Sequence, residues 1–362
     1  MRFILAAAVI QAALTTVADA AYINYTTVTG YFQQDDPITN ATTFDYTTTN
    51  LGLINRTYSA DCNTNNLTQW QRFARELFRL NLEAPTNVEY KLLIMGRHGE
   101  GYHNAAESFY TTPAWNCYYS LLNGNATNSW ADAELTPAGT KQAQIANNFW
   151  RSSITNQKIP IPQSYYTSPL QRCLATANIT FGNLTLPSSK AFKPTIKELL
   201  REGISLHTCD RRHNATYIHK TFPSYTFEAN FSEADPFWNG VTGETSAAQD
   251  IRSKTVLDDI FSHDDSTYIS ITSHSGEIAS LLRVLGHRTF SLSTGAVIPV
   301  LVRAETRSGN ATSTSASWSV SPHCTAPPVT SISTATTMGG CVCPNSATAV
   351  TTPLITIGPF RK

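Results

Sequence analysis

Hydrophobic and polar positions predict alternating strands and helices from residue 68 onward. Trp70, Phe73, Leu77 and Leu80 fall on one face of a predicted helix over 68–83. Short apolar runs predict buried strands at 89–96, 164–168, 194–200 and 267–273, and closing strands at 296–305 and 315–320. Further helices are predicted at 136–154, from 170 onward, at 242–262 and at 276–285. Thr136 and Pro137 suit the cap and first turn of the helix they open.

This alternation is typical of an α/β domain built on a mostly parallel sheet. We therefore expect a three-layer αβα sandwich, preceded by short strands and loops over 21–65. Two stretches, about 100–135 and 203–240, show no clear period and are rich in aromatic residues and Asn. We interpret both as cap insertions at the C-terminal ends of the strands.

Three segments are expected along the chain. Residues 1–20 resemble a secretory signal peptide, because Arg2 precedes an apolar stretch and Ala18-Asp19-Ala20 forms an A-x-A cleavage site. Residues 21–322 form the α/β domain, and 323–362 form a Ser/Thr/Pro-rich tail of low complexity. No stretch approaches the ~20 apolar residues of a membrane helix, so we expect no membrane partner.

Sequons and cysteines also favour a secreted, extracellular or cell-wall protein. Seven cysteines in an oxidising compartment predict disulfides with at least one thiol left over, and Cys341 and Cys343 are too close for a simple mutual bridge. Ten N-x-[ST] sequons predict surface asparagines that carry N-glycans at several positions. They are Asn24, Asn40, Asn55, Asn66, Asn125, Asn178, Asn183, Asn214, Asn230 and Asn310.

Composition narrows the classes of function. The formal net charge is zero and charged residues make up 14% of the chain, against ~25% in ordinary globular domains. Balanced charge argues against a polycationic nucleic-acid binder, so no nucleic-acid partner is expected. Hydrophobic residues reach 41%, which is enough for a large core and argues against global disorder.

Four short polar segments stand directly after predicted strands: 97–100, 169–172, 201–203 and 274–277. In an open α/β sheet, ligands bind beyond the C-terminal strand ends, so these segments are expected to converge on one crevice. They bring arginines, histidines and a glutamate together. Arginine guanidinium groups can bind phosphate oxygens through paired N–H donors. An imidazole can attack phosphorus, and a carboxyl group can protonate the departing oxygen. The pattern therefore predicts a phosphate-ester site.

Four motifs in order resemble the histidine phosphatase superfamily, in its phosphoglycerate-mutase-like branch. They are RHGEGYHN at 97–104, LTPAG with QA at 135–143, SPLQR at 168–172 with Thr176, and TSHSG at 272–276. The resemblance covers about residues 89–305, and LLREGISLHTCDRR at 199–212 resembles fungal members described as phosphomutase-like.

The resemblance implies a role for each matching residue. His98 is the nucleophile and forms a phosphohistidine. Arg97, Arg172 and His274 bind the phosphoryl oxygens and stabilise the transition state. Glu202 is the general acid and later the base for the hydrolytic water. Asn104 adds a phosphate contact, and no metal or other cofactor is implied, because the cationic pocket supplies the positive charge.

Some assignments leave alternatives open. The alternative for Glu202 is a surface carboxylate paired with Arg201. Glu100 and Glu244 are rival acids, although Glu244 suits the first turn of a helix. His207, Cys209 and His213 have spacing compatible with a metal site, but they lack a fourth ligand. The neighbouring Arg211, Arg212 and His213 lie either in the cap near the substrate or on a solvated loop.

The function expected from these features is a secreted phosphomonoesterase that hydrolyses organic phosphate esters at acidic pH. The alternatives are a phosphoglycerate-mutase-like phosphotransferase and a non-catalytic secreted glycoprotein that binds a phosphorylated ligand. A structural cell-wall protein, suggested by the tail, is a weaker alternative. The phytase-like branch carries Arg-x-Pro after its RHG, which this chain lacks, so phytase activity is not implied.

Overall fold

The computed structural model describes residues 21–62, 66–309, 316–321, 323–328, 341, 343 and 349–350. The expected signal peptide, Asn310 and most of the expected tail therefore lie outside the described residues. Eight of the ten sequon asparagines are exposed and Asn24 is half-buried. Within the described ranges, no helix is long and apolar enough to cross a membrane.

A seven-stranded sheet in the order β1-β8-β2-β7-β3-β4-β5 forms the centre of the molecule. Strands β2, β7, β3, β4 and β5 run parallel, and β8 and β1 pair antiparallel at one edge. The strands are β1 (Ala21–Thr27), β2 (Val88–Arg97), β3 (Ser164–Thr167), β4 (Thr195–Ile196), β5 (Thr226–Phe227), β7 (Tyr268–Ser273) and β8 (Val297–Ser308). The sheet is mostly parallel, as the sequence predicts.

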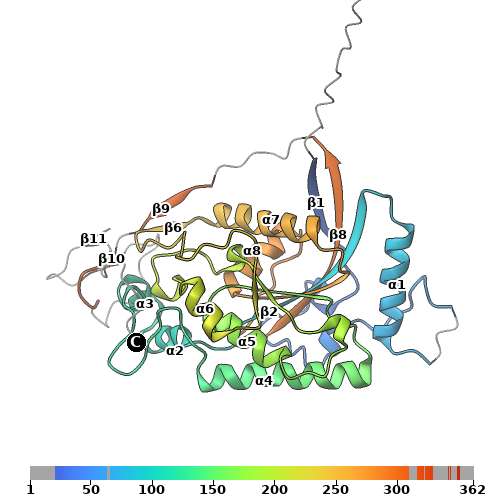
Figure 1. Cartoon of the computed structure of the whole chain (residues 1–362), viewed down its shortest axis with the longest axis horizontal. Helices are drawn as coiled ribbons and strands as arrows, with labels where there is room; N and C mark the ends of the chain where they lie inside the picture. Colours follow the sequence, from blue (N-terminus) through green and yellow to red (C-terminus); the bar gives the residue numbers. More distant parts are fainter. Residues whose placement is uncertain are drawn as a thin grey trace, which may run out of the picture.

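Helices cover both faces of this sheet, which confirms the αβα sandwich (Figure 1). On one face, Leu93 and Met95 of β2 pack against α7 (Ser246–His263) and α8 (Ser275–Val284). On the other face, Leu92 and Ile94 pack against α1 (Gln69–Glu83), α4 (Pro137–Ser152) and α5 (Gln171–Phe181). Successive residues of a strand point to opposite faces, so one apolar run serves both cores.

Two helices begin with threonine caps, and the cap predicted at Thr136 is confirmed. The side-chain oxygen of Thr68 accepts a hydrogen bond from the Gln71 amide at the start of α1. Thr136 does the same for the Gly139 amide, with Pro137 opening α4. These contacts satisfy backbone donors that a helix start leaves unpaired.

Three predicted elements differ from the structure. The strand expected at 194–200 ends at Ile196 and becomes a 3-10 turn, Glu198–Leu200, because the side chain of Glu198 is buried in ion pairs with Arg201 and Arg212. The helix expected from 242 begins at Ser246, because Thr245 caps it and 242–244 form β6 (Thr242–Glu244). The strand expected at 315–320 is shorter, β9 (Trp318–Val320), and pairs with β6 rather than closing the main sheet.

The two aperiodic stretches contain regular structure and contact each other. Residues 100–135 hold α2 (Tyr102–Tyr110) and α3 (Thr112–Cys117), while 203–240 hold α6 (Ala215–Thr221) and the edge strand β5. Thr208 in the second stretch donates a hydrogen bond to the Leu122 carbonyl in the first, at 2.6 Å. The second stretch is therefore only partly an insertion, because it also extends the sheet.

Two disulfides join distant parts of the chain. Cys117, at the end of α3, pairs with Cys341, and Cys324, in β10 (His323–Cys324), pairs with Cys343. Strand β10 also pairs with β11 (Ala349–Val350). Cys62, Cys173 and Cys209 are free, in line with the odd cysteine count.

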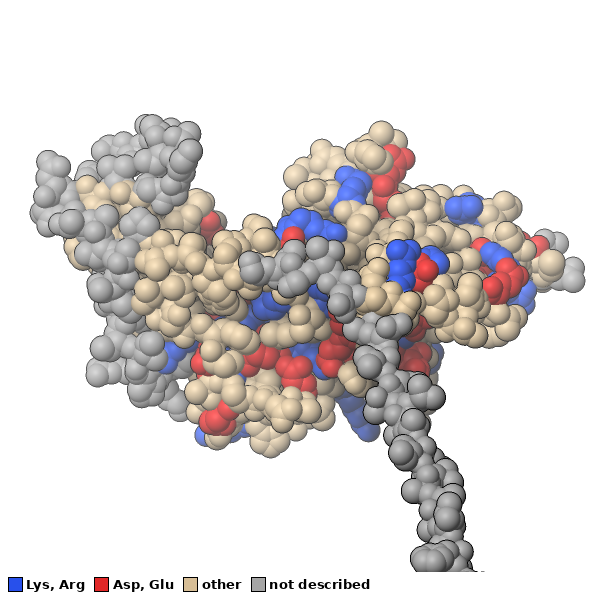
Figure 2. Space-filling model, turned by 90° about the horizontal axis from the view of Figure 1, so that it is seen from above, with Lys and Arg blue, Asp and Glu red and all other residues tan. Residues whose placement is uncertain are grey.

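Charged residues are mixed on the surface. On the face shown in Figure 2, basic and acidic residues lie interspersed among uncharged ones. This face offers no extended cationic surface of the kind that binds nucleic acid.

Candidate active site

The site forms where three parallel strands end side by side. Arg97, the last residue of β2, is in register with Ser273 at the end of β7, and Thr167 of β3 is in register with Thr272. The residues that follow these strands are His98, Ser168 and His274. The parallel register therefore brings three of the sequence-predicted segments to one crevice.

His98 is 1% exposed and its Nδ1 lies 2.7 Å from the carbonyl oxygen of Gly99. Because a carbonyl only accepts hydrogen bonds, Nδ1 carries the proton and Nε2 keeps its lone pair. Burial, then the charges of Arg172 and Arg97, hold the pKa of His98 well below its usual value. The imidazole is therefore neutral, with a nitrogen free to act as a nucleophile.

Close contact between two backbone segments holds His98 in place. A Cβ at Gly99 would lie 2.3 Å from the Gly139 carbonyl oxygen, and a Cβ at Gly139 would lie 2.0 Å from the Glu100 carbonyl oxygen. Only glycine fits at both positions, because any side chain would collide with backbone. The Gly99 amide also donates to Thr176 Oγ1 at 3.0 Å, which ties the RHG segment to α5.

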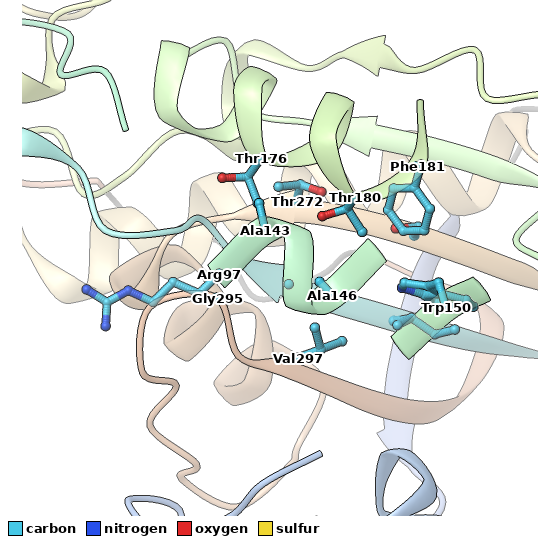
Figure 3. A pocket seen from close by; sticks show the side chains of 13 residues that line it. Arg97, Ala143, Ala146, Trp150, Thr176, Thr180, Phe181, Thr272, Gly295 and Val297 are labelled. Carbon is cyan, nitrogen blue, oxygen red and sulfur yellow. The ribbon is translucent and has the colours of Figure 1, made fainter. Parts of the chain in front are cut away.

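Arg97 is half-buried at the entrance to the crevice. Its Nη1 donates to the Leu292 carbonyl at 2.7 Å, while its buried Nε has no hydrogen-bond partner among the described residues. Burial is the main reason that its pKa is lowered, and the carboxylate of Glu202 acts in the opposite direction. Figure 3 shows the guanidinium directed away from the small hollow between α4 and α5 that is lined by Trp150 and Phe181. An unpaired guanidinium donor suits an anionic ligand.

Arg172 is 1% exposed, and each of its three guanidinium nitrogens donates one hydrogen bond. Nη1 donates to the Cys209 carbonyl at 2.6 Å, Nη2 to Asp210 Oδ1 at 3.2 Å, and Nε to His274 Nδ1 at 3.2 Å. Burial would lower its pKa, but Asp210 and the other neighbours more than offset burial, and the pKa is raised. Arg172 therefore remains a fixed positive charge beside His98.

His274 lies against the nucleophile, with its ring centroid 5.0 Å from that of His98. Its Nδ1 accepts from Arg172, and its Nε2 lies 2.8 Å from Ser168 Oγ and 3.3 Å from Cys173 Sγ. Burial, followed by the charge of Arg172, places its pKa well below the usual value. To hold a phosphoryl oxygen, His274 would exchange one of these contacts for the ligand.

Glu202 is brought to the same crevice at the start of α8. Its carboxylate accepts hydrogen bonds from the amides of Gly203 at 2.9 Å, Glu277 at 3.0 Å and Gly276 at 3.2 Å. Two of these donors closely follow His274 in the chain. The rival Glu244 is instead paired with Arg252, which gives it a structural contact outside this group.

Two weaker assignments are also located. Asn104 Oδ1 accepts from the Gly101 amide at 3.0 Å and caps α2, so a phosphate contact from its amide nitrogen stays a prediction. The other rival acid, Glu100, accepts from Thr136 Oγ1 at 2.7 Å.

The metal-binding trio considered from sequence is not assembled as a set. His213 Nδ1 lies 2.6 Å from Asp132 Oδ2, whereas the donor atoms of His207, Cys209 and Asp210 lie within 4.8 Å of one another. Asp210 is already paired with Arg172, whose positive charge opposes a cation at this place. We therefore assign no metal to this cluster.

Three residues of the site were not identified from sequence: Asp210, His103 and Glu277. Asp210 balances Arg172 from a distant segment, and no local pattern marks that pairing. His103 lies inside the RHGEGYHN motif, and Glu277 inside the segment that follows β7, so position alone was an available signal for both.

A buried neutral imidazole under the influence of the charges of Arg97 and Arg172, at the C-terminal edge of a parallel sheet, suits phosphoryl transfer. The chain belongs to the histidine phosphatase superfamily (branch 1), whose family model matches residues 93–295.

The chain is also similar to individual proteins. The chain is 49% identical to "Probable phosphoglycerate mutase" of Arthroderma benhamiae, over 81% of this chain and 89% of the relative. It is 36% identical to "Phosphomutase-like protein 3" of Candida albicans, over 78% of this chain and 80% of the relative. The crystal structure of phosphoglycerate mutase from Thermus thermophilus is similar at 20% identity, over 59% of this chain and 97% of that one, with a TM-score of 0.33.

The buried carboxyl group of Glu277 predicts that the stability of the fold depends on pH. Its side chain is fully buried, lies 3.0 Å from Arg252 in an ion pair and accepts a hydrogen bond from Ser253 at 2.8 Å. Burial raises the pKa of Glu277 to about 7, although the charge of Arg252 acts in the opposite direction. Below pH ~4 the carboxyl is protonated in both the folded and the unfolded chain. As the pH rises, the unfolded chain loses the proton first, so the free energy of unfolding should fall by roughly 3 kcal/mol up to about pH 7.5.

Urea unfolding from pH 4 to 8 tests this by comparing the wild type with Glu277→Gln. We expect the variant to lack this part of the pH slope, whatever its overall stability. Equal slopes in the two proteins would contradict the assignment.

Proposed function

We propose that the protein is a secreted phosphomonoesterase that hydrolyses organic phosphate esters through a phosphohistidine at His98, at acidic pH. The observation that carries this proposal is the hydrogen bond from His98 Nδ1 to the Gly99 carbonyl, which leaves Nε2 available as a nucleophile, while the charges of Arg97 and Arg172 act on the same imidazole. Family membership supports phosphoryl transfer as the class of reaction.

The first chemical step breaks the ester bond. His98 Nε2 attacks phosphorus, the phosphorus–oxygen bond to the alcohol breaks, and Glu202 gives a proton to the departing oxygen. Arg97 and Arg172 stabilise the negative charge on the phosphoryl oxygens in the transition state, which His274 also contacts. The products of this step are the free alcohol and phosphorylated His98.

The second step returns the enzyme to its starting state. Glu202, now ionised, takes a proton from a water molecule as that water attacks phosphorus. The bond from phosphorus to Nε2 breaks, inorganic phosphate leaves, and Glu202 is again protonated. A carboxyl group donates a proton only in its protonated form, which an acidic medium favours, and this supports an acidic optimum.

A phosphoglycerate-mutase-like phosphotransferase is the second candidate, because the relatives bear mutase names. A mutase needs a bisphosphorylated primer and must exclude water from its phosphohistidine, whereas hydrolysis needs only water. A secreted protein does not meet a glycolytic primer, so secretion favours the phosphatase.

Several observations support secretion of a fungal-type member. The chain carries two disulfides, and its sequon asparagines are mostly exposed, as N-glycans require. Two fungal relatives cover about four fifths of the chain.

The activity is tested on a generic aryl phosphate from pH 3 to 8, with and without EDTA, for the wild type and His98→Ala. We expect wild-type activity that is highest in acid and unaffected by EDTA. We expect His98→Ala to lose at least about 10³-fold, because the nucleophile is gone. 3-Phosphoglycerate with a bisphosphorylated primer serves as the matched mutase assay.

Activity that survives His98→Ala would contradict the central assignment. Isomerisation of the phosphoglycerate without release of inorganic phosphate would favour the mutase. A wild type that binds phosphate but turns over neither substrate would favour a non-catalytic phosphate-binding glycoprotein.

Secretion is tested by expressing the full chain in a fungal host and sequencing the N-terminus of the protein in the medium. We expect the mature protein to begin at Ala21 and to shift to lower mass when an endoglycosidase removes N-glycans. Retention inside the cell with Met1 intact would contradict secretion and leave the catalytic proposal untouched.

A further inference from the structure

His103 is a buried histidine beside the nucleophile that the mechanism above does not use. It lies in the first turn of α2, is 9% exposed, and its ring centroid is 5.4 Å from that of His98. Its Nδ1 is buried and has no hydrogen-bond partner within the described part of the chain. Buried polar atoms are nearly always paired, so the unpaired Nδ1 of this ring is unusual.

Gly101 makes room for this ring. A Cβ at residue 101 would lie 2.7 Å from Nδ1 and 2.8 Å from Cε1 of His103. The backbone φ of Gly101 is −98°, which any residue adopts, so the conformation itself does not require glycine. Glycine at 101 is thus needed for the space that His103 occupies.

The surroundings keep His103 neutral. Burial is the main cause that holds its pKa well below the usual value, and the charges of Arg172 and Arg97 act in the same direction. A neutral imidazole carries one N–H. Nδ1 lies against Gly101 with no acceptor, so a proton there would be an unsatisfied donor, and the proton resides on Nε2.

We propose that His103 is a further ligand-binding residue of the site, whose Nε2–H donates a hydrogen bond to an oxygen of the phosphoryl group held at His98. This inference rests on the proposed function. A neutral donor adds a hydrogen bond without adding positive charge to a buried pocket that already holds Arg97 and Arg172. Gly101 then acts as a positioning residue, because it allows the ring to take this place.

Three substitutions separate binding from space-filling. The amide nitrogen of glutamine takes about the position of Nε2, that of asparagine about the position of Nδ1, and leucine offers no donor. We expect His103→Leu and His103→Asn to lower kcat/KM for an aryl phosphate, and to weaken inhibition by orthovanadate, by about 10- to 100-fold each. We expect His103→Gln to recover most of both.

A double-mutant cycle adds a second test. Gly101→Ala should move the ring and give a similar loss, and Gly101→Ala combined with His103→Leu should lose little more than either alone. His219→Leu, on the exposed surface of α6, is the matched control and should behave as the wild type. Thermal unfolding of each variant shows whether it is folded before its activity is compared.

The outcomes are distinct. Three results would each overturn the role of His103 and leave the proposed function intact. They are a wild-type kcat/KM and orthovanadate inhibition in His103→Leu, recovery of both by asparagine instead of glutamine, and additive losses in the double-mutant cycle. If the Leu, Asn and Gln substitutions at His103 all unfold the chain, the folded Gly101→Ala variant provides the test. Inhibition of that variant by orthovanadate at the wild-type level would overturn the role of His103. A wild type that neither hydrolyses the ester nor binds orthovanadate would overturn the proposed function, and this inference with it.

Discussion

The charge of Arg172 is the feature on which the rest of the site depends. The guanidinium is buried, and the carboxylate of Asp210 at 3.2 Å balances it. Because the charge is retained in a poorly hydrated place, it acts strongly on every titratable neighbour. Together with burial, it lowers the pKa of His98 and His274, so both imidazoles are neutral and the first can act as a nucleophile. Burial also raises the pKa of the Cys173 thiol, which keeps this cysteine unreactive beside the catalytic groups.

The partner of Arg172 comes from the stretch that the sequence suggested was only a cap. Asp210 is fixed by a hydrogen bond from Ser205 at 2.7 Å and by a contact of its carbonyl oxygen with Arg201. Arg201 is in turn paired with Asp235 at 2.7 Å and with Glu198 at 3.1 Å. A chain of buried ion pairs, joined by the hydrogen bond from Arg201 to the Asp210 carbonyl, thus links the sheet, the second aperiodic stretch and the crevice at the strand ends. Such a network holds the guanidinium in one orientation, which transition-state stabilisation requires.

The sequence predicted the strand ends well and the charge balance poorly, for physical reasons. Strand β2 is buried on both faces along Leu92–Met95, so its apolar run is continuous and easy to identify, and the polar residues after β2, β3 and β7 mark one edge of the sheet. The strand at 194–200 was overestimated because Glu198 turns inward to meet two arginines, a long-range pairing that no local pattern shows. Asp210 was missed for the same reason. The position of His103 inside the RHGEGYHN motif was a signal, but its burial beside His98 depends on the space left by Gly101, which becomes visible only in three dimensions.

The central claim is that His98 carries the phosphoryl group between the two steps. Rapid quenching of the full-length protein with ³²P-labelled aryl phosphate measures this directly, because a phosphohistidine survives alkali and is lost in acid, unlike a phosphoserine. The account predicts an alkali-stable, acid-labile label on the peptide that contains His98, and none in His98→Ala. A label that survives acid, or one that persists in His98→Ala, would contradict it.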